Sequence, residues 1–167
     1  ASFMETTVEG DRRWLPPSRR HLHAGLYLPS RRGRQMDLAV AVDTSGSCQP
    51  DLPEFLTELH GILGAADRVR LRILDFDTRV TQEREIDETR LHQLRSMQFR
   101  GGGGSDCRAV FTRLENEPPQ ALVVLTDGLI QTPAKAPGYP VVWCLTADGQ
   151  APVDWGRCIQ LRPRQRD

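Results

Sequence analysis

Hydrophobic and polar positions follow two different periods along most of the chain. Short apolar runs, and runs that alternate with polar residues, favour β-strands, whereas apolar residues three or four positions apart favour helices. Six segments have the first pattern and three have the second. The expected strands are residues 37–43, 69–74, 79–86, 120–125, 139–145 and 158–161. The expected helices are residues 51–65, 87–97 and 106–117.

This order of elements predicts the fold class. Strands alternate with helices except at residues 79–86, which follow the preceding strand through the turn at 75–78 and are expected to form an antiparallel edge strand. Such alternation is typical of an α/β protein. We therefore expect a three-layer, Rossmann-like sandwich with a mainly parallel central sheet and helices on both faces.

The two ends of the chain lack these patterns. Residues 1–36 have no clean period and are punctuated by prolines, so we expect an extended N-terminal arm or linker there. The folded domain is expected to span residues 37–162. Residues 163–167 are expected to form a loose tail.

Composition limits the possible functions. A chain of 167 residues with a formal net charge of zero suits a single domain and is not a uniformly basic nucleic-acid binder. The charge is unevenly distributed, because residues 1–36 carry seven arginines against three acidic residues, whereas residues 37–156 carry eighteen acidic and eleven basic residues. The acidic middle suits a cation site, and nucleic-acid binding through the arginine-rich arm is a lesser alternative.

Apolar runs and cysteines indicate the compartment. No apolar run is long enough to cross a membrane, and the start of the chain shows no signal peptide. The four cysteines have neither CxxC nor zinc-finger spacing, so free thiols in a reducing, cytoplasmic environment are expected. We expect Cys48 and Cys107 to be small buried side chains that fill the core.

The first strand leads into the sequence Asp43-Thr44-Ser45-Gly46-Ser47. Asp43, Ser45 and Ser47 stand at every second position, so all three side chains can face the same side of an extended turn. Ligand sets made only of oxygen suit Mg²⁺, Mn²⁺ or Ca²⁺. The pentapeptide alone fits equally well a loop whose Asp and Ser cap the next helix.

Two further loops are expected at the same edge of the sheet. Residues 101–106 have the sequence Gly-Gly-Gly-Gly-Ser-Asp, and Thr126-Asp127-Gly128 follows a buried strand. Because ligands bind outside the carboxyl ends of strands in open α/β sheets, the loops are expected to converge. The glycines permit a close backbone approach, and no GK[ST] follows them to indicate a phosphate loop. The candidate metal ligands are Asp43, Ser45, Ser47, Ser105 and Asp127.

These loops together resemble the metal-ion-dependent adhesion site of von Willebrand factor A-type domains. Ser105 stands where that family has a Thr, which keeps the hydroxyl ligand but loses the methyl group that restricts its rotamer. The chain more closely resembles one group of such domains, the von Willebrand A-like C-terminal region of bacterial predicted metal-dependent peptidases. The segments that carry this resemblance include Gly25–Ser30, the four-glycine loop, Leu-Thr-Asp-Gly and Pro140–Trp143. The residues expected to support the ligands or to face a partner are Thr44, Gly104, Asp106 and Gly128.

The resemblance implies binding rather than catalysis. An adhesion site leaves one coordination position of the cation, expected to be Mg²⁺ or else Mn²⁺ or Ca²⁺, for a carboxylate of a protein partner. Related bacterial proteins act with MoxR-type AAA+ ATPases, so such an ATPase is the first partner expected.

Two alternatives to an adhesion site stay open at this stage. The chain could be part of a metal-dependent hydrolase or peptidase whose catalytic half lies outside it, since it has no HExxH motif. Hydrolysis within the chain would need a base such as Asp75, Asp77 or Asp106 beside the metal. The fold could also keep the motif and bind no metal.

Overall fold

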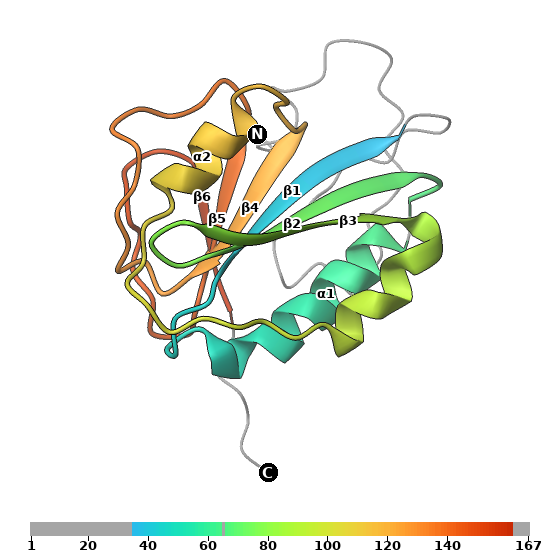
Figure 1. Ribbon diagram of the computed structural model, residues 1–167, viewed down its shortest axis with the longest axis horizontal. Helices are drawn as coiled ribbons and strands as arrows, with labels where there is room; N and C mark the ends of the chain where they lie inside the picture. The colour runs from blue at the N-terminus through green and yellow to red at the C-terminus, as the bar shows by residue number, and fades with distance from the viewer. Residues whose placement is uncertain (1–34, 65, 162–167) are drawn as a thin grey trace.

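The computed structural model describes residues 35–64 and 66–161, which form a six-stranded sheet between helices (Figure 1). The strands are β1 (Met36–Asp43), β2 (Val69–Phe76), β3 (Val80–Asp87), β4 (Ala121–Thr126), β5 (Val141–Leu145) and β6 (Arg157–Gln160). The helical segments are the 3-10 helix η2 (Gln49–Asp51), α1 (Leu52–Leu63), the 3-10 helix η3 (Glu88–Ser96) and α2 (Arg108–Leu114).

The strand order is β3-β2-β1-β4-β5-β6, and every neighbouring pair is parallel except β2 and β3. The prediction of a mainly parallel sheet with one antiparallel edge strand is therefore confirmed. From β1 the chain moves through α1 to β2, whereas from β4 it moves the other way across the sheet to β5. The carboxyl ends of β1 and β4 thus flank the switch point at which open α/β sheets bind ligands.

Helices cover both faces of the sheet, as expected (Figure 1). Because side chains alternate along a strand, β1 contributes to two apolar clusters. Leu38, Val40 and Val42 share one cluster with buried residues of α1 and η3. Ala39 and Ala41 share the other cluster with buried residues of α2.

The helix expected at residues 87–97 is a 3-10 helix, Glu88–Ser96, and the helix expected at 106–117 is shorter than predicted. In the 3-10 helix, the apolar residues Leu91 and Leu94 are three positions apart, which places them on one face of a helix with about three residues per turn, and Met97 follows as the C-cap residue. Helix α2 spans only Arg108–Leu114 within the expected 106–117. Cys107 is its N-cap residue, and the Asp106 carboxylate accepts a hydrogen bond from the Arg108 backbone N–H at 3.0 Å at the start of the helix.

The cysteines lie as the sequence predicted. Cys48, Cys107 and Cys144 are buried, Cys158 is exposed, and all four are free thiols. The N-terminal arm expected at residues 1–36, except for its last two residues, and the tail expected at 163–167 lie outside the described residues.

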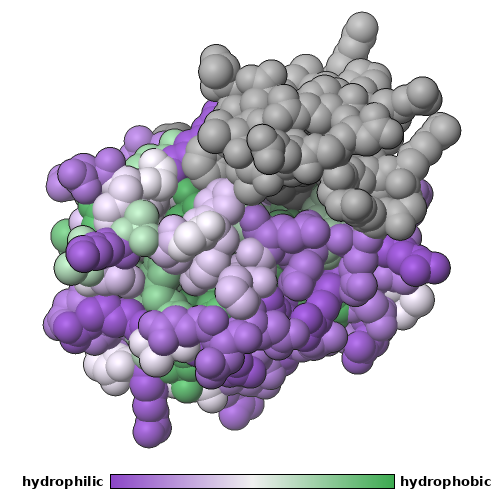
Figure 2. Space-filling view, turned by 90° about the horizontal axis from the view of Figure 1, so that it is seen from above, coloured by the Kyte–Doolittle hydropathy of each residue, from purple (hydrophilic) through white to green (hydrophobic). Residues whose placement is uncertain are grey.

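The described surface is mainly polar. In the view of Figure 2, hydrophilic residues cover most of the described surface and hydrophobic ones show only in small areas. Within residues 35–64 and 66–161, no helix has the length and apolar character needed to cross a membrane.

Candidate metal centre

Three loops meet at the carboxyl ends of β1 and β4. The first loop begins at Asp43, the last residue of β1, and carries Ser45 and Ser47. The second loop carries Ser105 ahead of α2, and the third follows β4 and carries Asp127. Hydrogen bonds join the first loop to each of the other two, across 62 and 80 residues of sequence. The convergence expected from the sequence is therefore present in the structure.

Asp43 is the buried centre of this arrangement, with 1% of its surface exposed. Its Oδ1 accepts hydrogen bonds from the Ser45 backbone N–H at 3.0 Å and from the Ser105 hydroxyl at 3.1 Å. Its Oδ2 accepts a hydrogen bond from the Thr126 hydroxyl at 3.0 Å. These contacts fix the carboxylate in one orientation and join all three loops to it.

Asp127 lies on the more exposed side of the site. Its Oδ2 accepts a hydrogen bond from the Ser47 hydroxyl at 2.7 Å, and its Oδ1 accepts one from the Leu129 N–H at 2.8 Å. The Ser47 and Ser45 hydroxyls are 3.1 Å apart. The five candidate ligands thus form two linked groups of oxygen atoms, one around Asp43 and the other around Asp127.

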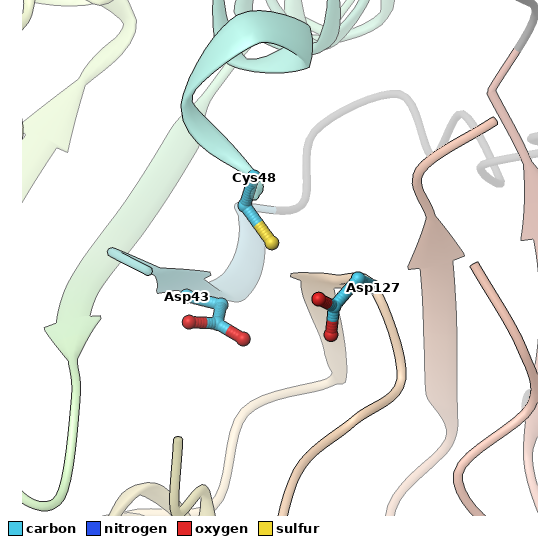
Figure 3. Close-up of side chains that lie close together, drawn as sticks. All are labelled: Asp43, Cys48 and Asp127. Atoms are coloured by element: carbon cyan, nitrogen blue, oxygen red, sulfur yellow. The ribbon is translucent and has the colours of Figure 1, made fainter. Parts of the chain in front are cut away.

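The carboxylates of Asp43 and Asp127 and the thiol of Cys48 come close enough to hold one ion. Each residue offers a ligand atom, and these atoms lie within 4.8 Å of one another (Figure 3). Ligand atoms around Mg²⁺, at about 2.1 Å from the ion, lie about 3 to 4 Å apart. Modest side-chain rotations would therefore bring these atoms into contact with a single cation.

Protonation limits what Cys48 can contribute. Burial raises the pKa of its thiol to about 11, and the nearby negative charge of Asp43 acts in the same direction. A thiol in its neutral form is a poor metal ligand. Its Sγ accepts a hydrogen bond from the Ser45 hydroxyl at 3.6 Å. The remaining donors are carboxylate and hydroxyl oxygens, which suit a hard divalent cation.

Within the described part of the chain, the two carboxylates have no basic partner, since neither Asp43 nor Asp127 forms an ion pair there. A buried carboxylate without a counter-charge is costly. A divalent cation bound between them would supply the missing positive charge, so the residues present fit such an ion.

The residues expected to support the ligands occupy structural positions. Thr44 is buried and donates from both its N–H and its hydroxyl to the Phe76 carbonyl, at 3.1 and 3.0 Å. Gly104 is exposed and lies beside Thr78. Gly128 has a φ of +87°, where a side chain would also overlap Gln150, so this turn requires glycine.

Asp106 is held away from a ligand role. It forms an ion pair with Arg108 at 2.7 Å, and the hydrogen bonds from Arg108 lower the pKa of its carboxyl. Its backbone N–H donates to the Asp77 carbonyl at 2.7 Å, and its strand-like bridge to Gln131 fixes the start of α2. Asp106 therefore positions Ser105 next to Asp43.

The other carboxylates considered as catalytic bases are also engaged elsewhere. Asp75 is buried, and its pKa is raised by burial and lowered in part by Arg84, with which it forms an ion pair. It shares its side of β2 with Leu71 and Ile73, which belong to the cluster beneath α1. Asp77 Oδ1 accepts from the Arg79 N–H at 3.2 Å and shapes the β2–β3 turn.

Sequence reasoning missed one member of the site, Thr126. Its hydroxyl donates to Asp43 and accepts from the Gly128 N–H at 3.1 Å, so it links the first and third loops. The available signal was a polar residue at the end of an apolar strand, on the same side as Leu122 and Val124.

Comparisons with known proteins place the chain in a family. Residues 38–162, well over half of the 167, match the family described as VWA-like domain (DUF2201). The fold is similar to the crystal structure of the conserved hypothetical protein BatB from Bacteroides thetaiotaomicron, with a TM-score of 0.50, 16% identity and 67% of each chain covered. No match was found among curated proteins. The chain belongs to the family of VWA-like domains.

Proposed function

We propose that this domain binds a divalent cation, Mg²⁺ in the first instance, and uses it to hold an acidic group of a partner protein. The observation that carries the proposal is the pair of carboxylates, Asp43 and Asp127, which meet without a basic partner among the described residues. Asp43, Ser45, Ser47 and Ser105 would hold the cation directly or through water, and Asp127 would bind directly or accept from a bound water.

The ligand set supports an open coordination position. Hydroxyl groups are uncharged ligands, so a cation held by three of them and one or two carboxylates still attracts a further anionic oxygen. Bound there, the cation supplies positive charge at the protein surface, where Ser47 is exposed. A carboxylate side chain of a partner protein matches this requirement.

The partner that we propose first is a MoxR-type AAA+ ATPase, on the basis of the family resemblance. Hydrolysis within this chain is less well supported, because Asp75 is paired with Arg84 and Asp106 with Arg108. An association with a catalytic half outside the chain stays compatible with a binding role for this domain.

Calorimetric titration with Mg²⁺ and Mn²⁺ tests the metal site. The wild type and an Asp67→Asn control, which removes an exposed carboxylate from the loop before β2, are expected to bind. Asp43→Asn, which removes one charge at nearly constant volume, is expected to lose binding. At a Mg²⁺ concentration of about 100 times the Kd, the wild type should gain about 2.7 kcal/mol of unfolding free energy over the EDTA-treated protein. No heat and no stabilisation of the wild type would contradict the proposal.

Capture of the purified ATPase on the immobilised domain tests the partner. Binding in Mg²⁺ that is lost in EDTA and in Asp43→Asn, but not in Asp67→Asn, is the expected result. Binding that ignores both the chelator and the substitution would rule out a metal-bridged contact. Metal-dependent hydrolysis of a protein substrate by the pure domain, abolished in Asp43→Ala, would replace this proposal with an enzymatic one.

A further inference from the structure

Leu129 stands out on the described surface. Among the large hydrophobic residues of 35–64 and 66–161, Leu129 is the exposed one, with a relative solvent-accessible surface of 78%. It follows Asp127 by two positions. Its neighbour Ile130 packs against the apolar cluster beneath α2, so the chain buries one of two consecutive aliphatic side chains and leaves the other in water.

The site itself fixes the position of Leu129. Its backbone N–H donates to Asp127 Oδ1, while Asp127 Oδ2 accepts from Ser47. The preceding residue, Gly128, donates to the Thr126 hydroxyl at 3.1 Å, and its positive φ sets the turn. Leu129 is therefore held by the same contacts that hold the candidate ligands.

Nearly all residues next to the five candidate ligands in the sequence are uncharged. Asp106 is the one charged neighbour, and Arg108 neutralises it at 2.7 Å. The other neighbours of the five candidate ligands are uncharged: Val42, Thr44, Gly46, Cys48, Gly104, Thr126 and Gly128. Among these sequence neighbours, none therefore presents an unpaired charge beside the ligands.

We propose that Leu129 forms an apolar contact beside the metal-held carboxylate, so that this edge selects an acidic residue with an aliphatic or aromatic group next to it. The inference rests on the proposed function, because the cation holds the carboxylate. It adds the chemical class of the partner segment: an acidic side chain flanked by an apolar one, and not a run of acidic residues.

Small carboxylates test this preference without any knowledge of the partner. Acetate, butanoate and hexanoate are titrated into the Mg²⁺-saturated wild type, and binding is followed by the amide NMR shifts of Gly128 and Leu129. Hexanamide serves as an uncharged control for the longest chain. We expect affinity to rise with chain length, by up to about fourfold for each methylene group that is buried. Hexanamide is not expected to bind.

Two variants separate the contact from the metal site. Leu129→Ser should bind Mg²⁺ and acetate as the wild type does but lose the gain for hexanoate, whereas Leu129→Met should keep that gain. Equal affinity for all three carboxylates, or a gain that persists in Leu129→Ser, would overturn the role of Leu129 and leave the proposed function standing. Failure of acetate itself to bind the Mg²⁺-loaded protein would overturn both.

Discussion

Replacing Gly101 with alanine should destabilise the domain through a single steric overlap. The glycine loop passes so close to the loop after β1 that a Cβ on Gly101 would overlap the Cβ and Oγ1 of Thr44 and lie 3.1 Å from its carbonyl oxygen. The backbone of Gly101 is not in the left-handed region, so the cost arises from this contact and not from φ.

The surroundings of Thr44 set the magnitude. Thr44 is 1% exposed, and its hydroxyl donates to the Phe76 carbonyl at 3.0 Å, so it has little freedom to move away. Overpacking of a buried site costs about 1–3 kcal/mol. Displacing the hydroxyl would cost about 1 kcal/mol more for the lost hydrogen bond. We expect Gly101→Ala to lower the free energy of unfolding by about 2–4 kcal/mol.

Urea denaturation of Gly101→Ala and Gly102→Ala measures this effect. Gly102 is the matched control, because a Cβ there would have no atom within 4 Å. Its substitution should change stability by less than about 0.5 kcal/mol. Equal stability of Gly101→Ala and the wild type, or equal losses in the two variants, would show that the close approach to Thr44 does not constrain the loop.

Two further predictions concern buried groups. At pH 8, iodoacetamide should label Cys158 in the native protein and spare the three buried thiols, because burial raises their pKa values to about 11 or 12. Mass spectrometry of labelled native and urea-unfolded protein checks this prediction. Rapid labelling of a buried thiol in the native protein would contradict it. Arg84→Ala should lower the free energy of unfolding in urea by about 3–5 kcal/mol, because it leaves Asp75 buried without its counter-charge. The control Arg113→Ala breaks a partly exposed ion pair with Glu83 and should lower it by less than about 1 kcal/mol. Similar losses in the two variants would refute the distinction.

Much of the fold could be predicted from the sequence because its strands are nearly continuous apolar runs. The run before Asp43 and the run before Asp127 each mark a strand buried on both faces. The alternation in 69–74 also marks a strand, although the structure buries Arg72 and leaves only Arg70 partly exposed. The site followed from this placement, since both aspartates come at the carboxyl ends of parallel strands. Periodicity does not separate a short 3-10 helix from an α-helix, so the pattern in 87–97 predicted a helix but not its 3-10 type.

Contacts between distant residues could not be predicted in the same way. The pairing of Asp75 with Arg84 depends on the register of β2 against β3, which shifts at Asp75 and Phe76. The hydrogen bond from Thr126 to Asp43 depends on β4 lying next to β1, across 83 residues of sequence. Each contact needs the three-dimensional strand order, which a one-dimensional pattern does not contain.

The pairing of β1 with β4 has a consequence for the order in which the domain is synthesised and folds. β2 and β3 leave the ribosome before β4, so 83 residues of synthesis separate Asp43 from Thr126. Contacts over such separations form late, because the intervening loop must be closed first. A nascent chain that ends before residue 120 therefore has the Asp43–Ser47 loop but lacks the second carboxylate, and only the completed sheet offers both to a cation.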